Sequence, residues 1–231
     1  MEIRIVNYFL AVLGLAGHLF LNVVLIRRKL AVKLPLFTIL TMFYLLRSAI
    51  LFLASFGSIS AWPYWTLITL DPVLQCVLFA TIIHAWWPPA LESKILRALA
   101  DFSLFVTVPL VSGLAAWFIG PSSHFSPENL YIKAGVFVSV LWIEAEFGVI
   151  ASSAGFLRPL PAFTQKVVRG FAIYSAADVI TEIGHKNFAA LRAAPTYLGL
   201  SYMRVGVYLL CLAVWITACY QEPRPNATRA R

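Results

Sequence analysis

Seven long, continuous apolar stretches dominate this sequence, and each is 18 to 25 residues long. A membrane-spanning helix needs about 20 mostly apolar residues. The strands of a closed barrel would instead alternate over about ten residues, so the continuous runs favour helices. We therefore predict an all-α, polytopic membrane helical bundle in a single domain, residues 1–231. The predicted spans are 5–26, 35–56, 64–85, 102–119, 132–156, 167–186 and 197–220.

The composition agrees with burial in a bilayer. Hydrophobic residues make up 61% of the chain and charged residues 12%, whereas a soluble domain carries about 25% charged residues. The three cysteines, Cys76, Cys211 and Cys219, all lie within apolar segments, as buried small side chains do. Their spacing indicates no zinc site and no disulfide framework, so we expect no metal and no cofactor.

The distribution of lysine and arginine between the connections predicts the orientation. One side of the bundle carries twelve of them: Arg27, Arg28, Lys29, Lys33, Lys94, Arg97, Arg158, Lys166, Arg169, Arg224, Arg229 and Arg231. The other side carries four: Arg4, Lys133, Lys186 and Arg192. Because the richer side is normally cytoplasmic, the N-terminus is predicted outside and the C-terminus inside. We expect a multi-pass protein of the cell inner (plasma) membrane.

The net charge of +8 does not indicate a nucleic-acid partner. The basic residues lie between the apolar segments, where they set orientation, and no basic face exists outside the membrane. The longest connections, 86–101 and 120–131, are too short for a folded domain. An output domain would therefore belong to a separate membrane or cytoplasmic signalling partner.

Seven ionisable residues lie inside the predicted spans: Arg47, Asp71, Glu144, Glu146, Asp178, Glu182 and Arg204. Each costs about 2.5–3.5 kcal/mol near the middle of a bilayer unless it is paired or lines a polar cavity. Five of them, excluding the two glutamates of the fifth span, fall about 6–14 Å below the outer surface at 1.5 Å per residue. Asp178 and Glu182 are four residues apart and share one helix face.

These residues form our candidate site, a polar cluster in the outer half of the bundle that is open to the extracytoplasmic side. The predicted ligand-binding residues are Arg47, Asp71, Glu144, Tyr174, Asp178, Glu182 and Arg204. Five carboxylates face two arginines, which indicates a bound cation or a cationic small molecule, or carboxyls that are protonated. The equally weighted alternative is a set of interhelical ion pairs that only fixes helix packing.

Other polar residues give weaker signals. Glu144 and Glu146 are two residues apart, so they point to different sides of their helix and do not both face one cavity. Pro72 either loosens the third span or lies in its first turns, and Pro109 indicates a kink. His18 and His84 are interpreted as packing or interfacial residues. Glu182 and His185 resemble half of a di-metal motif, which is weak support for a metal.

Several short motifs carry a family resemblance. They are Leu34-Pro35-Leu36-Phe37 with Tyr44 and Arg47, Tyr64-Trp65 with Asp71, Arg169-Gly170-Phe171-Ala172 with Asp178, and Leu200-Ser201-Tyr202 with Trp215. With these motifs the chain resembles an uncharacterised, acidobacterial-type family of seven-span membrane proteins, which is similar in layout to the seven-helix sensor regions of bacterial histidine kinases. The resemblance implies seven helices and no established activity. The sequence departs from it at His84-Ala85-Trp86, where the family has a glutamate.

The preferred functional hypothesis is a sensor- or receptor-like module that binds a small molecule and signals through a partner. A small transporter or channel component is the first alternative, and it requires polar residues along the whole membrane depth. An accessory subunit of a membrane complex is the second. An intramembrane enzyme is disfavoured, because the sequence reveals no nucleophile–base pair and no metal set.

Overall fold

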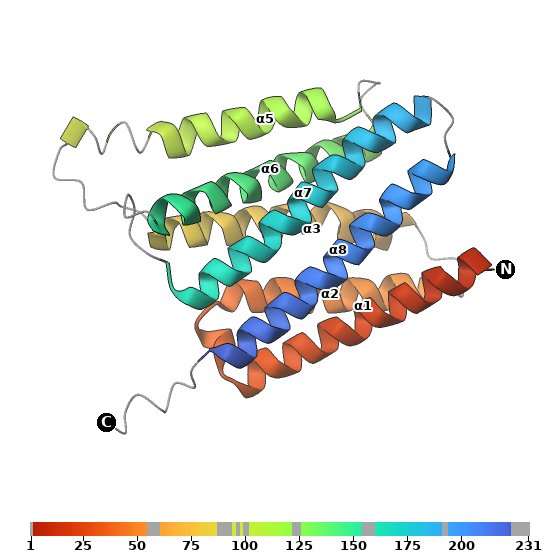
Figure 1. Cartoon of the computed structure of the whole chain (residues 1–231), viewed down its shortest axis with the longest axis horizontal. Coiled ribbons are helices and arrows are strands. Elements are labelled where there is room, and N and C mark those ends of the chain that lie inside the picture. The colour runs from red at the N-terminus through yellow and green to blue at the C-terminus, as the bar shows by residue number, and fades with distance from the viewer. Residues whose placement is uncertain are drawn as a thin grey trace. The chain divides into compact units, whose positions relative to one another are not determined.

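The computed structural model describes residues 2–54, 61–86, 94–95, 98, 102–121, 126–153, 160–190 and 194–222. Seven α-helices make up most of these residues (Figure 1). They are α1 (Glu2–Arg27), α2 (Pro35–Ala54), α3 (Ala61–Trp86), α5 (Val108–Ile119), α6 (Pro127–Ser153), α7 (Ala162–Ala190) and α8 (Ala194–Gln221). No strand occurs in the part of the chain that the structure describes, so the predicted all-α class is confirmed.

Each predicted span coincides with one helix to within about five residues. Four helices contain segments long and apolar enough to cross a membrane: Val6–Arg27, Thr66–His84, Pro127–Ser153 and Pro195–Gln221. Pro35–Ile50 and Phe105–Ile119 are shorter apolar segments. The predicted span ends at 55–56 and 154–156 lie outside the described residues, as do Arg158, Arg192, Arg224, Arg229 and Arg231.

The two prolines occupy different environments. Pro72 lies in the interior of α3 and not in its first turns, so the simpler interpretation of this residue is wrong. Pro109 lies in the first turn of α5, where its missing N–H costs little. The π-helical segment Ser103–Thr107 directly precedes α5. The fourth apolar stretch is therefore a π-helical turn followed by an α-helix, and the change takes place next to the proline.

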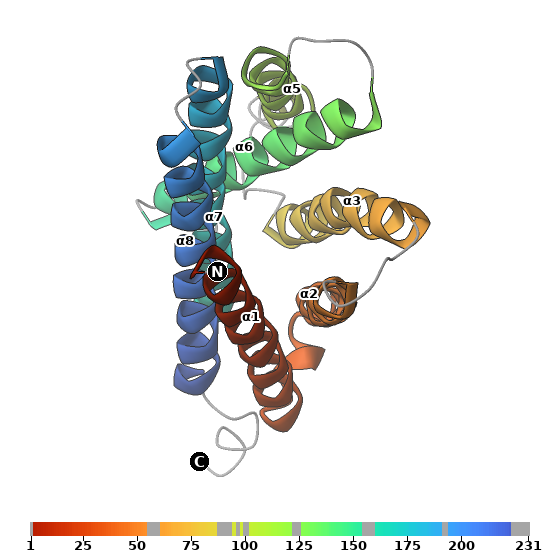
Figure 2. The same cartoon turned by 90° about the vertical axis from the view of Figure 1, so that its right-hand side faces the viewer.

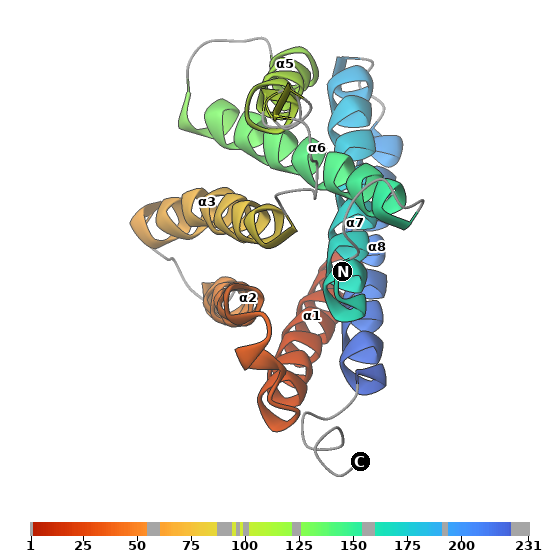
Figure 3. The same ribbon diagram turned by 90° about the vertical axis from the view of Figure 1, so that its left-hand side faces the viewer.

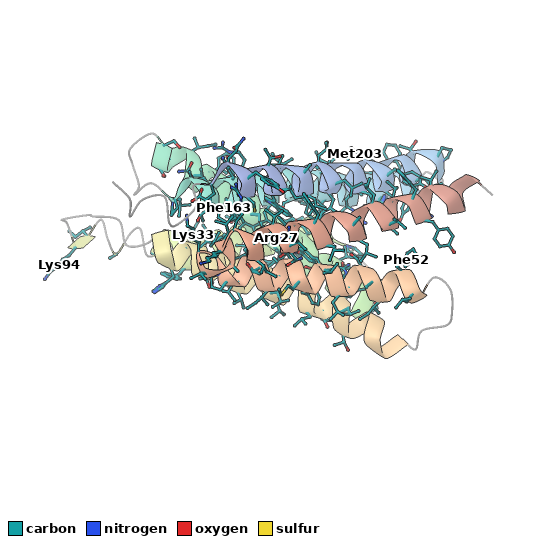
Figure 4. The ribbon with its side chains drawn as sticks, turned by 90° about the horizontal axis from the view of Figure 1, so that it is seen from below. Arg27, Lys33, Phe52, Lys94, Phe163 and Met203 are labelled. Atoms are coloured by element: carbon teal, nitrogen blue, oxygen red, sulfur yellow. The ribbon has the colours of Figure 1, made fainter. Side chains whose placement is uncertain are left out.

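The described chain divides into two compact units. Unit 1 comprises residues 1–74 and 208–231, and unit 2 comprises residues 75–207. In unit 1, α1 and α2 form a hairpin closed by the 3₁₀ turn Leu30–Val32. Figure 4 shows Arg27 and Lys33 toward the closed end of this hairpin and Phe52 toward the other end.

The second half of α8 completes the core of unit 1. Phe37 and Trp215, both fully buried, meet edge to face with their ring centroids 5.5 Å apart. A Cβ on Gly17 would lie 2.3 Å from Leu212 Cδ2, so only glycine lets α1 approach α8 this closely. His18 contacts Tyr208 and Arg28 contacts Cys219 further along both helices, so α1 and this half of α8 run in the same direction.

Unit 2 is built around Trp142 of α6, which is fully buried. Its ring stacks on Phe171 of α7 at 4.4 Å, and its Nε1 donates to Gln75 Oε1 of α3 at 3.1 Å. Within this unit α6 packs against both α5 and α7, and α7 runs beside the first half of α8 (Figures 2 and 3). The side-chain pairs show that each helix runs opposite to the next, because partners rise in number on one helix as they fall on the other.

Two basic side chains cap the carboxyl ends of helices. Arg28 Nη1 donates to the carbonyl oxygens of Cys219 at 2.9 Å and Glu222 at 3.1 Å, and also to that of Tyr220. Lys186 Nζ donates to Phe118 O at 2.8 Å and Gly120 O at 3.4 Å, at the end of α5. The last carbonyls of a helix lack partners within it and carry partial negative charge, so both cations stabilise these ends.

The Arg28 cap yields a stability prediction. Arg28→Met removes the donor from three carbonyls and is expected to cost about 1.5–3 kcal/mol, the range for hydrogen bonds to a charged group. The readout is a lowered midpoint of thermal unfolding for the purified protein in detergent. Arg27→Met, a neighbouring substitution at an exposed side chain, is the control. Equal midpoints for the two variants would contradict the assigned role of Arg28.

Candidate functional site

Helix α7 carries the densest set of polar side chains in unit 2. Its inward-facing polar positions, Ser175 and Thr181, are almost completely buried. Thr181 Oγ1 donates to Ala177 O at 2.8 Å within α7 and to Leu200 O of α8 at 3.4 Å. A polar helix can lie inside a bundle when neighbouring helices supply such partners. This explains why α7 is the least apolar of the seven predicted spans and still contributes core residues.

Asp178 and Glu182 of α7 share a single arginine of α8. Arg204 Nη1 donates to Asp178 Oδ1 at 3.0 Å and to Glu182 Oε1 at 2.9 Å. The second oxygen of Asp178 accepts a bond from Ser139 Oγ of α6 at 3.0 Å. The two carboxylates are 13% and 17% exposed and the arginine 33%. We call Asp178, Glu182 and Arg204 the α7–α8 ion cluster; with all groups charged it has one negative charge in excess.

Backbone geometry holds this cluster together. The spacing of four residues places both carboxylates on one face of α7, as predicted from the sequence. A Cβ on Gly184 would lie 2.3 Å from Leu200 Cδ1, so glycine at this position lets α7 and α8 approach closely. Tyr174, one turn before Asp178, interacts electrostatically with Arg204. Tyr174, Asp178, Glu182 and Arg204 are therefore brought together as predicted.

A second polar contact lies one turn beyond the cluster. His185 Nε2 is 3.1 Å from Ser201 Oγ and 3.2 Å from Tyr197 O, and the His185 and Tyr197 rings stack at 3.8 Å. The sequence analysis missed Ser201 because its partner is on another helix. Ser201 Oγ also bonds to Tyr197 O of its own helix at 3.2 Å, so this serine is held within α8. The contact extends the polar surface of α7 toward the Ala190 end.

Arg47 and Asp71 form a separate pair in unit 1. Arg47 of α2 donates to Asp71 Oδ2 of α3, and Tyr44 Oη donates to Oδ1 of the same carboxylate at 2.9 Å. Asp71 is 8% exposed. Both carboxylate oxygens are occupied and the pair is formally neutral. The predicted pairing of Arg47 with a carboxylate is therefore confirmed, while the expectation that it joins the α7–α8 ion cluster stays a prediction.

His18 belongs to the same part of unit 1 and was undervalued by the sequence analysis. It is 1% exposed, its Nε2 is hydrogen-bonded to Tyr208 Oη of α8, and its ring lies 5.6 Å from that of Tyr44. Its Nδ1 is buried and has no hydrogen-bond partner. A lone pair left without a partner costs less than a buried N–H, which favours the tautomer with the proton on Nε2.

Glu144 and Glu146 point to different helices, as their spacing predicts. Glu144 accepts a bond from Ser112 Oγ of α5 at 2.9 Å, whereas Glu146 Oε1 pairs with Arg169 Nε of α7 at 2.9 Å. In the contacts described, Glu144 therefore faces α5, while Ser139 of the same helix reaches Asp178 on α7. Among the described residues, no three His, Cys, Asp or Glu side chains are placed to hold a metal ion.

The shared arginine yields a prediction of energetic coupling. Arg204→Met leaves two partly buried carboxylates without a counter-charge and is expected to lower the thermal midpoint sharply. Glu182→Gln in the same chain should recover part of the loss, with a coupling of about 0.5–3 kcal/mol in a double-mutant cycle. Glu144→Gln, which lacks contact with Arg204, should be additive with Arg204→Met. Additivity of both pairs would show that the arginine stabilises neither carboxylate.

Comparison with known protein families, with curated proteins and with solved structures found no match to this chain.

Proposed function

We propose that this chain is a seven-span membrane protein with its N-terminus outside and its C-terminus inside. Helix α7 has 29 residues, and at 1.5 Å per residue such a helix exceeds the roughly 30 Å of a hydrocarbon core. Its ionisable residues Asp178, Glu182 and Arg169 are paired with other helices, which reduces the cost of placing them in lipid. These pairings support α7 as a span despite its polar sequence.

Helix directions support an odd number of crossings. In unit 1, α1 and the second half of α8 run in the same direction. In unit 2, successive helices alternate from α5 to the first half of α8. First and last helices that point the same way follow from an odd count. The excess of lysine and arginine at the other ends of α1 and α8 then supports a cytoplasmic C-terminus.

Within this topology we propose a sensor-like module that binds a small cationic molecule from the outer side. The observation that carries this proposal is the sharing of one arginine by two carboxylates in the α7–α8 ion cluster. The cluster lies 8 to 12 residues before the end of α7 at Ala190, about 12–18 Å of helix axis. An added cation would balance the excess carboxylate charge and compete with Arg204 for its partners.

Helix α8 offers a route from the cluster to the opposite end of the molecule. It is continuous from Ala194 to Gln221, so Arg204 and the carbonyls capped by Arg28 belong to one rigid element. A ligand that displaces Arg204 from Glu182 would favour a different position of α8. The proposed output is therefore a change at the cytoplasmic end of α8, which a separate partner detects.

A small transporter is the second candidate, and one observation favours it. Polar contacts in unit 2 continue along the α6–α7 interface away from the cluster, through Gln75 and Trp142 to Glu146 and Arg169. The sequence analysis regarded the inner halves of the helices as largely apolar. A series of polar groups at successive depths is what cation or proton movement requires.

A cation-binding experiment tests the proposed function. The full chain in nanodiscs is heated with choline, spermidine, arginine methyl ester, Na⁺ or Ca²⁺, and the thermal midpoint is recorded. A cation at one hundred times its Kd should stabilise the wild type by about 2.7 kcal/mol. Asp178→Asn and Glu182→Gln should abolish the shift. The matched control Glu144→Gln, which removes a carboxylate that bonds to α5, should retain it.

The possible outcomes separate the two candidates. A wild-type protein that no cation stabilises, or a shift that Glu144→Gln removes equally, rejects the binding site. Flux of the stabilising cation into proteoliposomes, lost in Asp178→Asn, would favour transport. Binding without flux supports the sensor-like module.

A further inference from the structure

The turn between α1 and α2 has an exposed apolar tip surrounded by cations. Leu30, 1% exposed, anchors the turn, while Val32 two residues later is 83% exposed. Arg27, Lys29 and Lys33 are all exposed around it. This combination is typical of a segment that inserts an apolar side chain at a membrane surface and keeps its basic groups among the headgroups.

Two of the four cations in this turn are used by the protein itself. Arg28 caps the carbonyls at the end of α8, and Lys33 Nζ pairs with Glu222 Oε1 at 2.7 Å. Among the described residues, neither Arg27 nor Lys29 has a hydrogen-bond or ion-pair partner. By sequence, residues 223–231 add three arginines and no carboxylate. The surface therefore has excess positive charge that this end of unit 1 does not balance.

The backbone of Lys29 supports a role for its side chain. Lys29 lies in the left-handed region with φ 57° and ψ 26°, and it is the one non-glycine residue with positive φ among the residues described. Glycine would adopt this conformation without the cost of roughly 1 kcal/mol that an L-residue incurs. A lysine in a position that suits glycine leads to a hypothesis that its ammonium group is needed there.

We propose that the α1–α2 turn binds the headgroups of anionic phospholipids in the surrounding leaflet, with Arg27 and Lys29 on the phosphate and Val32 among the upper acyl carbons. The inference uses the membrane topology of the proposed function and is independent of the α7–α8 ion cluster. An acidic soluble partner would explain the charges. It would not explain why the exposed apolar surface continues from the turn along α1, through Ile26 and Val23. A basic cluster directly beside a membrane span is the known pattern for anionic lipid.

Lipid retention by the full chain tests this assignment. Wild type and the double variant Arg27→Gln/Lys29→Asn are purified from detergent containing equal phosphatidylglycerol and phosphatidylcholine, and bound lipid is counted by native mass spectrometry. Asparagine at position 29 keeps the left-handed backbone available. At about tenfold per 1.4 kcal/mol and one such charge contribution of about 1 kcal/mol each, retention of phosphatidylglycerol should weaken roughly thirty-fold. Lys133→Gln, which removes a cation at the opposite end of the molecule, is the matched control.

Three further measurements decide the result. Retention by the wild type should fall as salt rises, because screening weakens headgroup contacts. Free glycerol phosphate and poly-glutamate should fail to displace the lipid; displacement by either would assign the turn to soluble anions or to an acidic protein segment and overturn the proposal. Equal retention by wild type and double variant would also overturn it. The cation-induced thermal shift should persist in the double variant, which separates this result from failure of the ligand site.

Discussion

The pairing of polar side chains between helices is the constraint on which the rest of this structure depends. A charged or hydrogen-bonding group surrounded by apolar helices is tolerated only when another helix supplies its partner. Asp178, Glu182 and Glu146 obtain their partners from α8 and α7, and Asp71 obtains its partners from α2. Because each bond has a defined geometry, these pairs fix which face of each helix points inward, which apolar packing alone specifies poorly.

Helix α8 connects the two kinds of contact that order the bundle. Its leucines fill the spaces left by glycines on α1 and α7, and such close backbone approach maximises dispersion contacts where no hydrophobic driving force separates helix from lipid. The same helix carries Arg204, and its last carbonyls are capped by Arg28. One continuous element thus joins the most charged site to the basic end of the molecule.

The sequence predicted the helices well because apolar length and charge placement are local properties. It also predicted that Glu144 and Glu146 diverge, since the helical repeat alone determines their directions. The His18–Tyr208 bond and the Arg28 cap join residues about 190 positions apart, and no local pattern announces such partners. The π-helical turn at Ser103–Thr107 was missed for another reason: its sequence is as apolar as an α-helix, and only the neighbouring proline gave a signal.

Charge balance distinguishes the two ion-paired groups. The Arg47–Asp71 pair is neutral, both oxygens of its carboxylate are occupied, and Tyr44 supplies one of the donors. A ligand would have to break contacts there without relieving any imbalance. The α7–α8 ion cluster is different, because one guanidinium nitrogen serves two carboxylates and satisfies neither completely. A cation that entered would gain attraction from both carboxylates and release Arg204, so binding and helix displacement would be the same event. This coupling is what a membrane sensor needs, and the neutral pair in unit 1 would keep α2 and α3 fixed while it occurs.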